Sequence, residues 1–140
     1  VHWFDTSLET SGSVWRQYFQ EFHYRPEFSE SDPEGLEHQL ELCRSLKLAD
    51  SAPLFFFLNI SACHLPCRGE RSPAGQAKAL EWVDQRLPAM WALLPRPCHV
   101  LLWSDHGTLL GEELNGRPRW GHGFHHPLVV TVPATDFLLA

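Results

Sequence analysis

The apolar positions of the chain follow a helical period in several separate stretches. Within residues 13–23, four aromatic side chains recur at helical spacing, which predicts a helix with an aromatic stripe. These are Trp15, Tyr18, Phe19 and Phe22. A second helix is predicted to begin at Asp32, an N-cap residue followed by Pro33 at the first helical position, and to end near Leu48. Its apolar face consists of Leu36, Leu40, Cys43 and Leu46.

A third helix is predicted to begin at Ser72 and Pro73, which repeat the same N-terminal pattern. An apolar face continues from there as far as Leu94. Its members are Leu80, Val83, Leu87, Trp91 and Leu94. Pro88 lies inside this stretch. Because proline removes a backbone donor and clashes with the preceding turn, it should kink or divide the helix.

Two continuous apolar runs, at residues 54–58 and 100–103, are bounded by turn residues and predict strands that are buried on both faces. A helix joins them, so they should be parallel with a right-handed crossover. The same reasoning pairs residues 1–4 with residues 54–58. The predicted fold class is therefore α/β, with a mostly parallel sheet flanked by helices and a final antiparallel strand at residues 128–132.

Candidate chemistry gathers where these strands end, since open α/β sheets bind their ligands at the carboxyl edge. Asp105 and His106 follow one predicted strand and His64 follows another. Residues 107–126 lack a helical period and are rich in glycine, which predicts an irregular loop. An antiparallel final strand would then return His122, His125 and His126 to the neighbourhood of Asp105.

A carboxylate beside an imidazole, with further histidines nearby, is a common arrangement for binding Zn²⁺ or Mn²⁺. Asp105 and His106 point to opposite sides of an extended backbone, so both reach one ion only if the chain turns, which Gly107 permits. The alternative is a turn in which Asp105 bonds to its own backbone. The nearby histidines favour the metal. We therefore predict Asp105, His106 and His126 as metal ligands.

Two further histidines are predicted to be catalytic, His64 and His122. An imidazole at the position of His64 suits a ligand for the substrate anion or a proton donor to the leaving group. The alternative for His64 is a loop histidine bonded to a backbone carbonyl. His125 is expected to be exposed and without a role. Glu112 is kept as an additional candidate that could position a water molecule.

Composition narrows the class of protein. The 140 residues, of which 44% are hydrophobic, should form a single compact domain. A net charge of -6 without any Lys/Arg-rich block argues against a nucleic-acid partner. No apolar stretch approaches the ~20 residues that span a bilayer, and no signal pattern is present, so we expect no membrane partner.

The four cysteines are expected to be reduced thiols, which fits a cytoplasmic protein. Cys43 falls on the apolar face of the second helix and Cys98 at the start of a strand. Cys63, His64 and Cys67 resemble half of a zinc site, but no second cysteine pair completes it. A structural zinc at this place is retained as an alternative.

Three segments carry a resemblance to the alkaline phosphatase and sulfatase superfamily. Residues 103–107 are similar to its Ser-Asp-His-Gly element, and residues 120–133 resemble its Trp-Gly-x-Gly loop followed by a Val-Pro strand. Residues 55–66 are similar to the strand and histidine loop of sulfatase-like hydrolases. The chain thus resembles the C-terminal portion of a bacterial sulfatase-like metal-dependent hydrolase.

The resemblance implies that Asp105 and His106 bind one divalent metal, and that His126 or His122 binds a second metal or the substrate. Some branches have a lysine at the position of His122. His64 would hold the anion or the leaving group. The chain lacks the Cys-x-Pro-x-Arg signature of sulfatases, and no aspartate precedes His64 as in two-metal phosphodiesterases.

Family members carry their nucleophile and another metal-binding carboxylate in an N-terminal portion that precedes the first strand seen here. The resemblance therefore implies that residues 1–140 are the C-terminal part of a longer catalytic domain, whose missing N-terminal portion is a partner of this chain. The implied function is hydrolysis or transfer of small-molecule phosphate or sulfate esters. The alternative is a non-catalytic, degenerate domain of the superfamily or a zinc-stabilised structural module.

Overall fold

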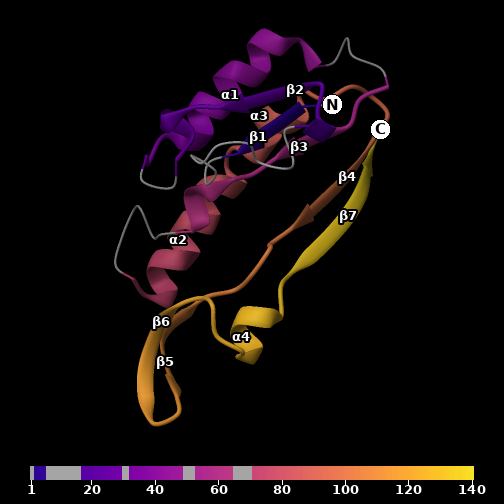
Figure 1. Ribbon diagram of the computed structural model, residues 1–140. Coiled ribbons are helices and arrows are strands. Elements are labelled where there is room, and N and C mark those ends of the chain that lie inside the picture. Colours follow the sequence, from indigo (N-terminus) through magenta and orange to yellow (C-terminus); the bar gives the residue numbers. More distant parts are fainter. Residues whose placement is uncertain (1, 6–16, 30–31, 49–52, 65–70) are drawn as a thin grey trace. The chain divides into compact units, whose positions relative to one another are not determined.

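The computed structural model describes residues 2–5, 17–29, 32–48, 53–64 and 71–140, and for residues 2–5 the backbone alone. The chain divides into two compact units, Val1–Pro95 and Arg96–Ala140 (Figure 1). Two compact units can belong to one domain, so the single domain over residues 1–140 stays a prediction. Among the helices of the described residues, none combines the length and apolar character that crossing a membrane requires.

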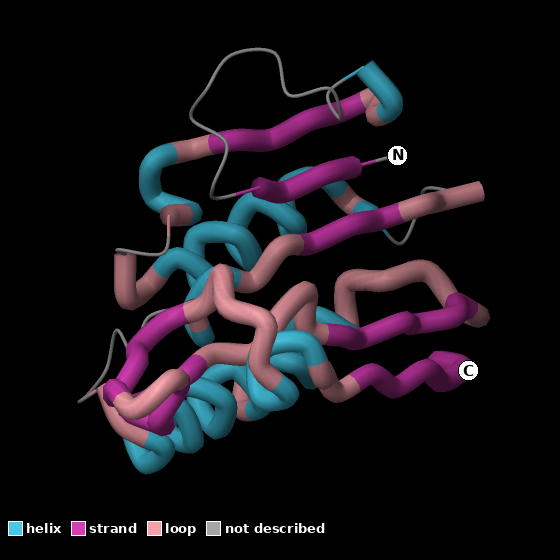
Figure 2. The backbone as a smooth tube through the Cα atoms, turned by 60° about the horizontal axis from the view of Figure 1, so that its bottom comes forward, coloured by secondary structure: helices cyan, strands magenta, loops and turns pink. Residues whose placement is uncertain are grey.

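The first unit contains a three-stranded parallel sheet of order β2-β1-β3, whose strands lie side by side in Figure 2. The strands are β1 (His2–Asp5), β2 (Glu21–Tyr24) and β3 (Phe56–Leu58). In the register, Phe4 lies opposite His23 of β2 and Leu58 of β3. The chain emerges from β3 into the loop that carries His64.

The helices of the first unit supply most of its core. They are α1 (Gly35–Leu46), α2 (Pro73–Asp84) and α3 (Leu87–Trp91), with short 3-10 turns η2 (Pro26–Phe28) and η4 (Ser61–Cys63). The buried cluster contains Phe28, Leu36, Leu40, Cys43, Leu48, Trp82, Val83 and Met90. The apolar face predicted for the second helix is therefore the face that α1 buries.

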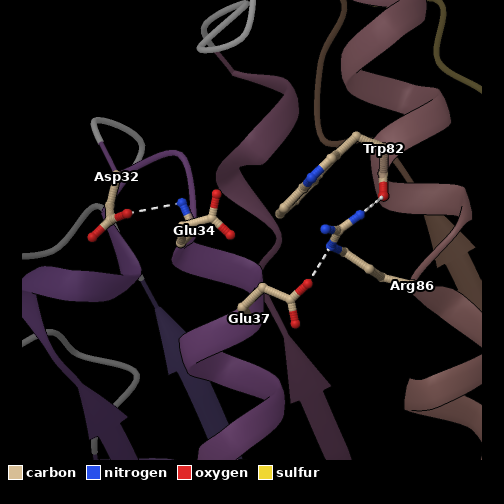
Figure 3. Close-up of polar contacts among 5 residues, drawn as sticks. All are labelled: Asp32, Glu34, Glu37, Trp82 and Arg86. Atoms are coloured by element: carbon tan, nitrogen blue, oxygen red, sulfur yellow. Dashed lines mark hydrogen bonds and ion pairs between the residues drawn. The ribbon is translucent and has the colours of Figure 1, made fainter.

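The sequence predicted the first residue of α2 correctly but placed the start of α1 two residues too early. The Ser72 side chain accepts a hydrogen bond from the Gly75 amide at 3.1 Å, and Pro73 is the first helical residue. Pro88 divides the predicted long helix, since α2 ends at Asp84 and α3 begins at Leu87. In front of α1, Asp32 accepts from the Glu34 amide at 2.8 Å (Figure 3), and the helix begins only at Gly35.

An arginine joins α1 to the turn between α2 and α3. Arg86 Nε donates to Glu37 Oε1 at 2.6 Å, and Arg86 Nη1 donates to the Trp82 carbonyl at 3.0 Å (Figure 3). The guanidinium also lies 3.7 Å from the centroid of the Trp82 ring. Charge-assisted hydrogen bonds and a cation–π contact on one half-buried side chain fix the packing of these helices.

The predicted helix at residues 13–23 is wrong where the structure describes it. Residues 21–24 form β2, and Trp15, with the rest of residues 13–16, lies outside the described residues. The Phe19 ring contacts the Phe55 ring at a centroid distance of 6.2 Å. Aromatic residues favour strands as well as apolar helix faces, and pairing with β1 decided between the two.

The second unit, Arg96–Ala140, consists of two antiparallel pairs and a short helix. β4 (Cys98–Trp103) pairs with β7 (Ala134–Leu139), and β5 (Leu109–Leu114) pairs with β6 (Arg117–Gly121). α4 (Pro127–Val130) precedes β7. The β5–β6 turn is Asn115-Gly116, with φ of 54° and 74°, the positive values that a tight two-residue hairpin turn requires.

The mostly parallel sheet predicted from the sequence is wrong. The described strands form three separate sheets, and β4 pairs antiparallel with β7 instead of extending a parallel sheet. The reason is visible in β4: Val100 is buried but Leu101 is 59% exposed, so the apolar run does not mark a strand buried on both faces. Residues 107–126 contain a hairpin, and residues 128–132 include part of α4.

The cysteines among the described residues, Cys43, Cys63 and Cys98, are free thiols. Cys67 lies outside the described residues. Burial raises the pKa of Cys43 from 9.0 to about 12, and the neighbouring Arg44 charge offsets this only in part. Cys43 therefore stays protonated at neutral pH.

We predict that Cys43 is inert to iodoacetamide at about pH 8 while Cys98 is alkylated, because the thiolate is the reactive form. Alkylation followed by mass spectrometry tests this. Because the pKa is raised in the folded state, its stabilising effect is complete below about pH 9 and is lost as pH rises toward about 12. The free energy of unfolding should fall over that range, and less so in Cys43→Ala. Equal labelling of Cys43 and Cys98 in the folded protein would contradict the prediction.

Candidate metal centre

The turn at residues 104–107 follows β4 and lies beside the start of β7, since Trp103 is paired with Ala134. Ser104 organises it through two hydrogen bonds. Its Oγ donates to the His106 carbonyl at 2.6 Å, and its amide donates to the Pro133 carbonyl at 3.2 Å. These bonds hold the Asp105-His106 pair in a tight turn that is tied to the segment leading into β7.

Gly107 brings this turn into direct contact with α4. Its amide donates to the Val129 carbonyl at 2.8 Å. A Cβ built on Gly107 would lie 1.9 Å from the Leu128 carbonyl oxygen, far inside van der Waals contact. Gly107 is not among the glycines with positive φ. The sequence therefore identified the right residue, but the structure needs glycine here for close backbone approach and not for an unusual dihedral angle.

Asp105 and His106 are arranged so that both can face one ion. Asp105 Oδ1 accepts from the His106 amide at 3.0 Å, and His106 Nδ1 lies 2.9 Å from the Gly107 carbonyl. Because a carbonyl only accepts, Nδ1 carries the ring proton, and in the neutral imidazole Nε2 then carries the lone pair. His106 Nε2 lies 3.8 Å from Asp105 Oδ2. Ligands at about 2.0–2.2 Å from one zinc ion are at most about 4.4 Å apart, so this separation is compatible with shared coordination.

The Asp105 turn thus combines both interpretations offered by the sequence. One carboxylate oxygen bonds to the backbone, as in a capped turn, while the other faces His106 Nε2. The contact of His106 Nδ1 with a backbone carbonyl is also the usual arrangement of a metal-binding histidine, whose second ring nitrogen is held by an acceptor.

His122 lies against His106. The two imidazole rings are stacked, with centroids 4.0 Å apart and planes inclined by 29°. A ligand nitrogen of His122 lies within 4.8 Å of one on His106. His122 is exposed and directly follows Gly121 at the end of β6. The hairpin β5–β6 therefore returns an imidazole to the turn that follows β4.

The structure gives His126 a different contact. His126 is the N-cap of α4, and its Nδ1 accepts from the Leu128 amide at 3.2 Å. A neutral imidazole that accepts through Nδ1 carries its proton on Nε2, so this ring cannot ligate a metal in the same state. The proposed ligand role of His126 thus competes with helix capping, and it stays a prediction. His125 is exposed.

Glu112 has a structural contact. Its carboxylate accepts a hydrogen bond from the Leu110 amide. This contact lies where the β5–β6 register shifts between Leu110 and Glu113, and Gly111 has a φ of 111° there. An irregularity of this kind leaves ladder groups unpaired, and Glu112 satisfies one of them.

His64 belongs to the first unit, at the end of η4, and is exposed. Its amide donates to the Ser61 carbonyl at 2.9 Å. The loop that carries it is anchored by buried Gln39, which donates to the Asn59 carbonyl at 2.9 Å, and by Gln76, which donates to the Cys63 carbonyl at 3.1 Å. The catalytic assignment of His64 stays a prediction, as does a zinc site with Cys67.

Comparison with known proteins gives one short similarity. A segment of 37 residues is 54% identical to the phosphopentomutase of Shewanella denitrificans and covers 26% of this chain. The match spans 9% of the length of that enzyme. Phosphopentomutase is a member of the alkaline phosphatase superfamily. The similarity weakly supports that superfamily. It does not support the sulfatase-like branch in particular. No family model and no solved structure matches the chain.

Arg119 was not singled out from the sequence. It lies in β6 two residues before Gly121, and its guanidinium carbon is 5.6 Å from the centroid of the Phe124 ring. The available signal was its place directly before the histidine-containing loop in a segment with few cations.

We predict that Gly107→Ala lowers the free energy of unfolding by about 1–3 kcal/mol, because the backbone of Leu128 must move to admit a methyl group. Denaturant unfolding measures the change. Gly116→Asn is the control, since nothing lies within 4 Å of a Cβ at that position and asparagine tolerates its positive φ. An unchanged stability in Gly107→Ala would show that the contact with α4 does not constrain the turn.

A second prediction separates the two roles of His126. His126→Ala should lower the free energy of unfolding by about 1 kcal/mol, whereas His126→Asn, which retains an N-cap acceptor, should leave it nearly unchanged. Thermal unfolding of both variants tests the cap. If His126 is a metal ligand instead, both variants lose metal affinity to the same extent.

Proposed function

We propose that Asp105, His106 and His122 bind a divalent cation, Zn²⁺ or Mn²⁺, in an enzyme that hydrolyses or transfers phosphate-type esters. The proposal rests chiefly on the geometry of His106. Its Nδ1 is held by the Gly107 carbonyl, its Nε2 faces Asp105 Oδ2 at 3.8 Å, and a ligand nitrogen of His122 lies within 4.8 Å of one on its ring. Fixing one ring nitrogen orients the other for a ligand.

The donor set fits such an ion. One carboxylate and two imidazoles are ligands that both Zn²⁺ and Mn²⁺ accept in proteins. The 84% exposure of the Asp105 side chain leaves room around the carboxylate for a substrate oxygen or water. When bound, a divalent ion polarises the ester oxygen and favours ionisation of the nucleophile.

The choice of phosphate-type esters comes from similarity. The matched relative is a phosphopentomutase, and the Ser-Asp-His-Gly element points to the same superfamily. The finer assignment, a sulfatase-like hydrolase, rests on the sequence resemblance alone. Within this proposal His64 holds the ester anion or the leaving group, and the nucleophile comes from a portion of the same protein that precedes these residues.

The metal site is tested by titrating Mn²⁺ and Zn²⁺ into the whole chain by isothermal titration calorimetry. Asp105→Asn and His122→Gln should each weaken binding by about tenfold or more, since each removes a ligand. His125→Gln is the matched control, because it removes an exposed imidazole from the same loop. If His122→Gln and His125→Gln bind the metals equally well, the assignment of His122 is wrong.

The proposed reaction is tested with the same variants, introduced into the longest natural form of the protein. Hydrolysis of p-nitrophenyl phosphate should be lost on treatment with EDTA, restored by Mn²⁺ or Zn²⁺, and strongly reduced in Asp105→Asn. p-Nitrophenyl sulfate, assayed in parallel, separates the phosphate and sulfate alternatives. Undiminished activity in EDTA would exclude metal-dependent chemistry.

A further inference from the structure

The second unit has few cations from which to build an anion site. Residues 96–140, all of them described, contain three arginines and no lysine. Arg96 precedes β4 and donates to the Ala140 carbonyl, at the opposite end of β4 from Asp105. Arg117 begins β6 beside the hairpin turn and is exposed. The third, Arg119, lies toward the end of β6 that leads to His122.

Arg119 lies on the covered face of the hairpin. Residues two apart along a strand share a face, so Arg119 shares one with Gly121, whose partner across the hairpin is Leu109. Leu109 has no exposed surface, whereas Trp120, on the opposite face, is 51% exposed. The chain then folds back so that the Phe124 ring lies near the guanidinium. Phe124 is two residues from His122, within about 7 Å along the backbone.

The hydrogen bonding of Arg119 is incomplete. Its Nε is buried and has no hydrogen-bond partner among the described residues. The carboxylate of Glu112, on the facing strand, accepts from the Leu110 amide and not from Arg119 Nε. A buried charged donor without an acceptor is unfavourable and calls for a bound anion or water. Because Nε itself is closed to solvent, an anion would be received by the terminal Nη donors of this guanidinium, in the chain segment that leads into the His122 loop.

We propose that Arg119 binds the non-bridging oxygens of a phosphate-type substrate at this site. The inference rests on the proposed function and adds the residue that recognises the anion. A guanidinium offers parallel N–H donors that match two phosphate oxygens, and the ring of Phe124 holds its plane in place. Neither Arg96 nor Arg117 is positioned for this role.

The test is calorimetric titration of inorganic phosphate into the whole chain loaded with Mn²⁺. Arg119→Gln should bind phosphate about tenfold more weakly or worse, because it loses charge-assisted hydrogen bonds. The phosphate affinity of Arg119→Lys should lie between those of the unaltered chain and Arg119→Gln, since lysine keeps the charge without the paired donors. Arg117→Gln is the matched control, with the same charge change on the same strand, and should bind phosphate like the unaltered chain. Mn²⁺ affinity should be unchanged in all three variants.

The outcomes separate this inference from the proposed function. If Mn²⁺ binds through Asp105 and His122 but Arg119→Gln retains full phosphate affinity, the role of Arg119 is refuted and the metal site stands. Equal weakening in Arg119→Gln and Arg117→Gln also refutes it, since general charge would explain both. Failure of Mn²⁺ to bind the unaltered chain refutes both proposals. Thermal unfolding monitors folding, and Arg119→Lys supplies the test if Arg119→Gln does not fold.

Discussion

The arrangement of the candidate site depends on the close backbone approach of Gly107 to α4. The Gly107 amide bonds to Val129, and no side chain fits between Gly107 and the Leu128 carbonyl. This contact fixes the turn after β4 against the segment that follows the hairpin β5–β6. The residues between the two anchors include the hairpin and the histidine loop. The contact at Gly107 therefore holds the two ends of this segment together, and His122 stacks on His106 within the segment that it closes.

Local signals in the sequence predicted α1 and α2 well, although the helix expected at residues 13–23 was wrong. Ser72 with Pro73 and the apolar face from Leu36 to Cys43 report interactions within one helix and its core face. Sheet organisation was not accessible in the same way. The run at residues 100–103 suggests burial on both faces, yet strand partners are chosen by contacts far apart in sequence, and β7 became the partner of β4. The Asn115-Gly116 turn was the local signal for the hairpin.

The candidate site was partly predictable, because adjacent Asp105 and His106 are recognisable by residue type alone. The sequence did not predict which histidine of the following loop joins them. His122 and His126 are chemically equivalent in the sequence, and only the backbone decides that one stacks on His106 while the other caps α4. Arg119 was missed for a similar reason, since burial of a single guanidinium nitrogen leaves no trace in the sequence.

The hydrogen bond from His106 Nδ1 to the Gly107 carbonyl has a consequence for affinity. An imidazole that is already held in one orientation loses little conformational entropy when a ligand binds to its other nitrogen. Asp105 is held less completely, because only Oδ1 accepts a hydrogen bond from the His106 amide while the side chain is 84% exposed. The candidate centre is therefore more pre-organised on the imidazole side than on the carboxylate side, which would let a bound ion be accommodated by adjustment of Asp105.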